Sequence, residues 1–145
     1  MEIQTHADID APPERVWAVL VDFERHPAWN PFIREIRGEA LEGARLLVRL
    51  GPPGGSAMTF KPVVTEAEPG RALAWRGTLG AGWLFRGEHT FRLEPLGAGR
   101  TRFHHGEAFG GLLVPVLRRS LDADTRRGFE AMNAALKAEA ERGAA

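Results

Sequence analysis

The sequence predicts an α+β domain in which a curved antiparallel β-sheet packs against one long C-terminal helix. Three observations support this prediction: a strand followed by a helix start at the N-terminus, a run of strand-like segments joined by short turns, and a helical apolar stripe in the last thirty or so residues. Turns of a few residues cannot connect parallel strands, so neighbouring strands must be antiparallel. A twisted sheet that curls around a helix leaves space between the two layers.

The N-terminal segment predicts one strand and then short helical structure. Residues 2–10 alternate between apolar and polar side chains, as a half-buried strand does. Residues 10–14 (DAPPE) follow with the proline and acidic residues typical of a helix start. Pro27 must end that helix, so residues 22–29 form a turn or a second short helix.

The middle of the chain predicts six further strands, which makes about seven in all. Their expected ranges are residues 32–39, 45–50, 56–68, 71–79, 83–95 and 100–109. Residues 112–142 then predict the long helix, with an apolar stripe at helical spacing formed by Leu117, Leu121, Gly128, Met132 and Leu136.

Length and composition limit the possible classes of protein. The chain has 145 residues, 19 basic and 19 acidic groups and no cysteine. We therefore expect a single domain over residues 1–145, without thiol chemistry and without the basic surface that nucleic-acid binding needs. The sequence has neither a membrane-spanning segment nor a recognisable signal peptide, and we expect a cytoplasmic monomer or homodimer.

Two of the predicted strands bring polar residues to an otherwise apolar inner face. In residues 83–95 the alternation turns Trp83, Phe85, His89 and Phe91 to one side. In residues 100–109 the shared face carries His105, Glu107 and Phe109, and the hairpin register places His89 opposite either His105 or Glu107.

The three polar residues His89, His105 and Glu107 have several interpretations. They can form a hydrogen-bonded structural pair, anchor the polar end of a ligand, or act as general acid and base. They lack the spacing of a known metal motif, and we expect no metal and no cofactor. We expect the ligand-binding residues to be Trp29, Phe32, Phe60, Trp75, Phe85, His89, Phe91, His105, Glu107, Phe109, Leu117 and Met132.

Five segments of the chain together resemble one protein family. They are residues 9–17 (IDAPPERVW), 29–32 (WNPF), 87–91 (GEHTF), 107–112 (EAFGGL) and 129–137 (FEAMNAALK). They are similar to the START/Bet v 1-like (SRPBCC) superfamily, in its bacterial polyketide cyclase/dehydrase-like branch, over essentially the whole chain. The resemblance implies a helix-grip fold that encloses a hydrophobic cavity.

Relatives in that superfamily bind lipids, sterols, hormones or polyketides, and some cyclise or dehydrate the bound molecule. We therefore expect this protein to bind a small hydrophobic or amphipathic ligand between the sheet and the C-terminal helix. One alternative is a polyketide cyclase or dehydratase that transfers protons through His89, His105 and Glu107. Another is a co-chaperone-like interaction protein that binds no ligand, since a fold alone does not determine activity.

Overall fold

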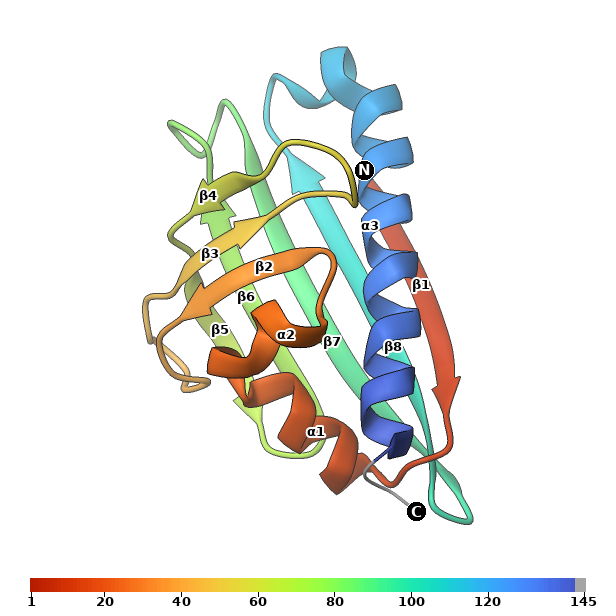
Figure 1. Cartoon of the computed structure of the whole chain (residues 1–145). Coiled ribbons are helices and arrows are strands. Elements are labelled where there is room, and N and C mark those ends of the chain that lie inside the picture. Colours follow the sequence, from red (N-terminus) through yellow and green to blue (C-terminus); the bar gives the residue numbers. More distant parts are fainter. Residues whose placement is uncertain (143–145) are drawn as a thin grey trace.

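A five-stranded antiparallel sheet lies beside the long C-terminal helix in the computed structural model, which describes residues 1–142 (Figure 1). In spatial order its strands are β1 (Glu2–Ile9), β8 (Arg100–Gly110), β7 (Arg86–Gly97), β6 (Ala72–Thr78) and β5 (Val63–Glu68). Strands β5 to β8 form a meander, and β1 joins it at β8. The predicted α+β class and the antiparallel pairing are confirmed.

A second, three-stranded sheet contains β2 (Ile33–Arg37), β3 (Leu47–Leu50) and β4 (Met58–Phe60). The prediction of one strand over residues 56–68 was wrong, because the chain leaves β4 at Lys61 and Pro62 and enters β5 in the other sheet. Proline has no N–H for a strand ladder, and the Pro62 carbonyl instead accepts a hydrogen bond from Leu46 N at 2.8 Å. The described residues thus contain eight strands, where the sequence predicted about seven.

Residues 43–46 connect the two sheets. The amide of Gly43 donates to the carbonyl of Val64, and the amide of Val64 donates to the carbonyl of Ala44, both at 2.8 Å. A bridge between Arg45 and Val63 lies beside them. The small sheet therefore folds over the large one, and Figure 1 shows it beside α3 on the same face of the large sheet.

The turn before β7 differs from the prediction. The prediction placed Trp83 on the inner face, but its side chain is 66% exposed. The amides of Leu84 and Phe85 both donate to the carbonyl of Ala81, which makes a turn there, and β7 begins only at Arg86. Strand alternation does not apply within a turn, so it gave the wrong side for Trp83.

Helical segments α1 (Pro13–Val21), η1 (Phe23–Arg25) and α2 (His26–Trp29) connect β1 to β2, as predicted. Asn30 then turns the chain into β2, because its Oδ1 accepts hydrogen bonds from the amides of Phe32 and Ile33, both at 2.9 Å. The imidazole of His26 lies behind Asn30, with Nε2 donating to Leu20 O at 2.7 Å and Nδ1 accepting from Asn30 Nδ2 at 3.1 Å. This buried arrangement holds Phe32 in position.

The C-terminal helix α3 (Val114–Arg142) has two different halves. Its second half is core, where Phe129, Met132 and Leu136 are fully buried. Its first half is more exposed and carries Leu117 and Leu121, which belong to the same predicted stripe. A Cβ at Gly128 would overlap the ring of Phe32, so glycine allows the helix and this ring to approach closely.

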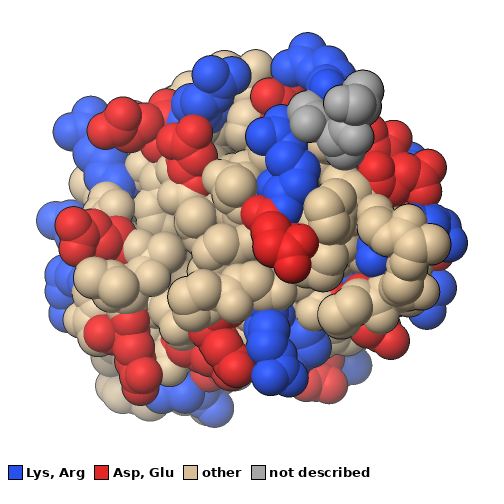
Figure 2. Space-filling view, turned by 90° about the horizontal axis from the view of Figure 1, so that it is seen from below, with Lys and Arg blue, Asp and Glu red and all other residues tan. Residues whose placement is uncertain are grey.

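Charged residues of both signs are interspersed on the face shown in Figure 2. This distribution agrees with the equal numbers of acidic and basic groups in the sequence. Within residues 1–142, the helices lack an apolar stretch long enough to cross a bilayer.

Candidate functional site

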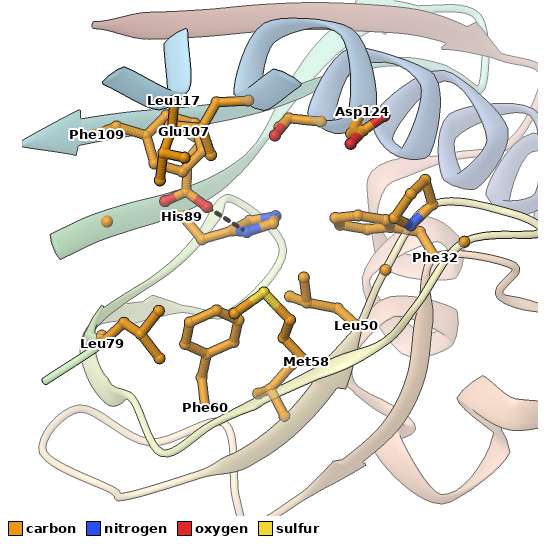
Figure 3. Close-up of a pocket in the computed structure, with 18 of the residues that line it drawn as sticks. Phe32, Leu50, Met58, Phe60, Leu79, His89, Glu107, Phe109, Leu117 and Asp124 are labelled. Atoms are coloured by element: carbon orange, nitrogen blue, oxygen red, sulfur yellow. Dashed lines mark ion pairs between the residues drawn. The ribbon is translucent and has the colours of Figure 1, made fainter. Parts of the chain in front are cut away.

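A largely apolar pocket of about 470 Å³ lies between the two sheets and the first half of α3. Figure 3 shows Phe60, Met58 and Leu79 on one side of the pocket and Phe109 and Leu117 on the other. Its apolar lining consists of Phe32, Val48, Leu50, Met58, Phe60, Trp75, Leu79, Phe85, Phe109, Leu117 and Leu121. A cavity of this size and composition is typical of small-molecule sites.

Most of the residues expected to bind a ligand do line this pocket. They are Phe32, Phe60, Trp75, Phe85, His89, Glu107, Phe109 and Leu117. Four expected residues lie elsewhere: Trp29 is half-buried beside His26, and Phe91, His105 and Met132 are buried in the core behind the pocket wall. Strand alternation identifies the inner face but does not separate residues that reach a cavity from residues that other side chains cover.

Several lining residues were not among the predicted site residues. The loop after β3 contributes Gly51, Pro52, Gly55 and Ser56, and α3 contributes Ser120, Asp124, Thr125 and Arg127. The glycines and prolines of this segment do indicate from the sequence that a loop lies at the end of a strand. The α3 residues carry no such signal, because only the packing of the helix shows which turn lies over the pocket.

Glu107 and His89 are the polar pair in the pocket wall. Their Cα atoms are direct partners across β7 and β8, so the second of the two predicted registers is the correct one for His89. The Oε1 of Glu107 lies 3.1 Å from Nδ1 of His89 (Figure 3). A hydrogen on Nδ1 would not be aligned with this oxygen for a hydrogen bond, and Nδ1 is a buried nitrogen that has no hydrogen-bond partner in residues 1–142 as long as Glu107 is a carboxylate.

Behind this pair a chain of hydrogen bonds runs into the core. The Nε2 atoms of His89 and His105 are 2.7 Å apart, and Nδ1 of His105 is 2.9 Å from Oδ1 of Asn133 on α3. The Nδ2 of Asn133 donates to Oγ1 of Thr5 at 2.9 Å, and the Thr5 hydroxyl donates to the carbonyl of His105 at 3.0 Å. Sequence reasoning did not identify Thr5 or Asn133, because they come from the two ends of the chain.

Burial controls the charge of these groups. Desolvation lowers the pKa of His89 to about 3. Desolvation, with a smaller contribution from the neighbouring His89, also holds the pKa of His105 well below its ordinary value. Burial, assisted by Glu88, raises the pKa of Glu107 well above its ordinary value. All three shifts favour the uncharged form of the group.

A metal centre has no basis in the part of the chain that the structure describes. In residues 1–142, three or more His, Asp or Glu side chains do not come together in a group that could hold an ion.

Comparison with known protein families identifies the chain. A family model described as "Polyketide cyclase / dehydrase and lipid transport" matches residues 1–141. The chain belongs to this family. Membership suggests a small hydrophobic ligand and supports ligand binding or a cyclase-type role. Comparison with curated proteins gives no match.

This member of the polyketide cyclase/dehydrase family has a helix-grip fold. Solved structures of the START/Bet v 1-like superfamily share that fold. The Zhui aromatase/cyclase from Streptomyces sp. R1128 is 22% identical with a TM-score of 0.79, and the match covers 98% of this chain and 94% of that chain. A START superfamily protein from Mycobacterium smegmatis is 19% identical with a TM-score of 0.73, and 97% of each chain is covered.

A third solved structure has the same fold at lower identity. Norcoclaurine synthase from Thalictrum flavum, solved as a point mutant with a transition-state analogue, is 13% identical with a TM-score of 0.76. The match covers 100% of this chain and 96% of that chain. These likenesses confirm the fold that the resemblance implied.

Proposed function

We propose that the protein binds a small hydrophobic or amphipathic molecule in the pocket between the sheets and α3. The observation that carries the proposal is the combination of a cavity of about 470 Å³ with largely apolar walls and a buried Glu–His pair in one of them. Aromatic side chains such as Phe60, Trp75 and Phe85 would pack against the body of the ligand. Glu107 and His89 would contact its polar end.

Titration with N-phenyl-1-naphthylamine tests this proposal, because this neutral probe gains fluorescence in an apolar site. We expect saturable binding to the wild-type protein and weaker binding to Met58→Trp, which adds bulk to the pocket wall. Leu41→Trp is the matched control, since Leu41 is 58% exposed and outside the pocket whereas Met58 is 46% exposed and lines it. The absence of saturable binding, or equal binding by both variants, would overturn the proposal.

A second candidate function is a cyclase or dehydratase activity at the same pair. It is favoured by the unpartnered Nδ1 of His89 next to the carboxyl of Glu107, because an acid and a base lie 3.1 Å apart within the pocket wall. In a dehydration, Glu107 would protonate a hydroxyl that leaves as water, and Nδ1 of His89 would take a proton from the adjacent carbon as the double bond forms. Return of that proton from His89 to Glu107 would restore both groups.

The dehydration of 3-hydroxy-1-tetralone to 1-naphthol would test the second candidate, because the product is fluorescent. We expect Glu107→Gln to lower the rate about 100-fold or more while substrate affinity changes little. Unchanged turnover in Glu107→Gln, or no turnover by the wild-type protein, would overturn the dehydratase function. His105 does not reach the pocket, and it would act as a positioning residue through His89.

A further inference from the structure

The hydrogen bonds behind the pocket form a chain, and the direction of each one follows from the bond between Thr5 and His105. A backbone carbonyl only accepts hydrogen bonds, so the Thr5 hydroxyl donates its hydrogen to His105 O at 3.0 Å. The Thr5 oxygen is then the acceptor for Nδ2 of Asn133 at 2.9 Å. This orients the amide, and Oδ1 of Asn133 faces Nδ1 of His105 at 2.9 Å.

The same reasoning assigns the hydrogens of both imidazoles. Because an amide oxygen only accepts, Nδ1 of His105 carries a hydrogen, and the Nε2 of this neutral ring is an acceptor. The 2.7 Å contact between the two Nε2 atoms therefore needs the hydrogen of His89 on Nε2. A neutral His89 then has a bare lone pair on Nδ1, which is the atom nearest Glu107.

Two acceptor atoms that face each other in a buried place are unfavourable, so one hydrogen has to lie between Oε1 of Glu107 and Nδ1 of His89. Burial of both groups favours this hydrogen on the carboxyl. The second oxygen, Oε2, is then a carbonyl-type acceptor. The Glu107 side chain is 12% exposed and lines the pocket, and a Cβ at Gly87 would lie 3.0 Å from Oε2. Glycine at position 87 thus leaves room beside this acceptor.

We propose that Glu107 presents a hydrogen-bond acceptor to the pocket through Oε2 while it donates to His89 through Oε1, and that the pocket consequently selects ligands with an uncharged hydroxyl group and rejects carboxylates. This inference rests on the proposed binding function and specifies its ligand class. A phenol or alcohol donates to Oε2 and leaves the chain of hydrogen bonds intact. A ligand carboxylate would bring a negative charge against an acceptor oxygen in an apolar wall. Arg127 also lines the pocket, but its guanidinium is paired with the carboxylate of Asp124 at 3.7 Å.

A set of three probes with the same ring system tests the inference: 2-naphthol, 2-methylnaphthalene and 2-naphthoate, each titrated calorimetrically at pH 7. The wild-type protein should bind 2-naphthol about tenfold or more tightly than 2-naphthoate. In Glu107→Leu, the affinity for 2-naphthol relative to 2-methylnaphthalene should fall roughly tenfold, because the hydroxyl is left buried without a partner.

Glu107→Gln is the decisive variant. Its amide NH₂ can donate to Nδ1 of His89 and its amide oxygen can accept from the ligand, which reproduces the neutral carboxyl. The preference for 2-naphthol should therefore stay within about twofold of the wild-type value. If Glu107 were ionised, Gln would replace a charge-assisted bond with a neutral one, and the preference for 2-naphthol should fall several-fold below the wild-type value.

The outcomes separate the two proposals. Binding of 2-naphthoate as tight as that of 2-naphthol, or a Gln variant whose preference for 2-naphthol falls several-fold below the wild-type value, overturns the ligand class and leaves the binding function standing. Failure of both 2-naphthol and 2-methylnaphthalene to bind the wild-type protein overturns the binding function and the ligand class together.

Discussion

The ring of Phe32, just before β2, lies directly against the backbone of α3 at Gly128. Phe32 is also part of the pocket lining and packs edge-on against Phe129, with ring centroids 5.5 Å apart. This contact joins the segment before the small sheet to the helix at the wall of the pocket. Any change in it alters both the stability of the fold and the shape of the cavity.

Gly128→Ala should destabilise the protein by about 1–3 kcal/mol, because the new methyl group overlaps the Phe32 ring. In an ordinary helix the same change stabilises by roughly 0.5–1 kcal/mol. In the Phe32→Ala background the overlap is gone, so Gly128→Ala should become stabilising. Urea unfolding of the two single variants and the double variant measures this change of sign, and destabilisation in both backgrounds would show that Phe32 is not responsible.

The stability of the protein should fall as the pH is lowered below about 6.5, and His26 should account for part of that slope. Burial lowers the pKa of His26 from 6.5 to about 4, so between these values the unfolded state binds a proton that the folded state does not. The free energy of unfolding therefore decreases toward low pH, by up to about 1.4 kcal/mol per pH unit for this group.

His26→Phe should lower stability at every pH, because it removes the hydrogen bonds to Leu20 and Asn30, but its slope between pH 6.5 and 4 should be shallower. His89 and His105 retain their contributions, which have the same sign. Urea unfolding at several pH values compares the two slopes. Parallel curves for the wild-type protein and the variant would contradict the assignment.

Glu107→Gln should make the protein more stable at pH 7. The folded-state pKa of Glu107 is raised, so above the ordinary value of 4.5 the unfolded state gains by ionisation while the folded state keeps its proton. The stability that this group contributes is present below pH 4.5 and is lost as the pH rises. Glutamine cannot ionise, so the gain over wild type should be present at pH 7 and absent near pH 4. A destabilised Gln variant at pH 7 would contradict the neutral pairing.

The two imidazoles should have opposite tautomers. The hydrogen-bond directions require the Nε2–H form for His89 and the Nδ1–H form for His105. Nitrogen-15 NMR of the ring atoms distinguishes these forms from each other and from imidazolium. Asn133→Leu removes the acceptor for His105 Nδ1, and we expect it to shift the ring signals and to cost about 1–3 kcal/mol of stability. A doubly protonated His89 at pH 7 would contradict the assignment.

Two phenylalanines of β8 should respond differently to truncation. Phe103 is fully buried in the core, whereas Phe109 is half-buried and lines the pocket. Phe103→Ala should cost about 3–5 kcal/mol, and Phe109→Ala should cost less because its site is already next to a cavity. Phe109→Ala should also weaken binding of N-phenyl-1-naphthylamine. Equal losses of stability, with unchanged probe binding in Phe109→Ala, would contradict the placement of Phe109 in the pocket wall.

Local patterns were enough to predict much of the fold. Alternating side chains and short turns predicted the meander, and the spacing from Leu117 to Leu136 predicted α3, because each pattern is a property of neighbouring residues. The same patterns placed His89 and Glu107 on the inner face. They gave a wrong result at Trp83 and at Pro62. Trp83 lies in a turn closed by hydrogen bonds to the Ala81 carbonyl, and the Pro62 carbonyl accepts a hydrogen bond from the distant residue Leu46, so neither residue continues a regular strand.

The chemistry of the site depended on contacts between distant parts of the chain. Thr5 and Asn133, which are separated by 128 positions, orient the hydrogens of His105 and His89. Periodicity also could not show that Phe91, His105 and Met132 lie behind the pocket wall while Met58, Leu50 and the first turns of α3 line it. Strand alternation only assigns a side chain to a face, whereas the packing of the helix and the second sheet against that face determines which side chains remain open to a ligand.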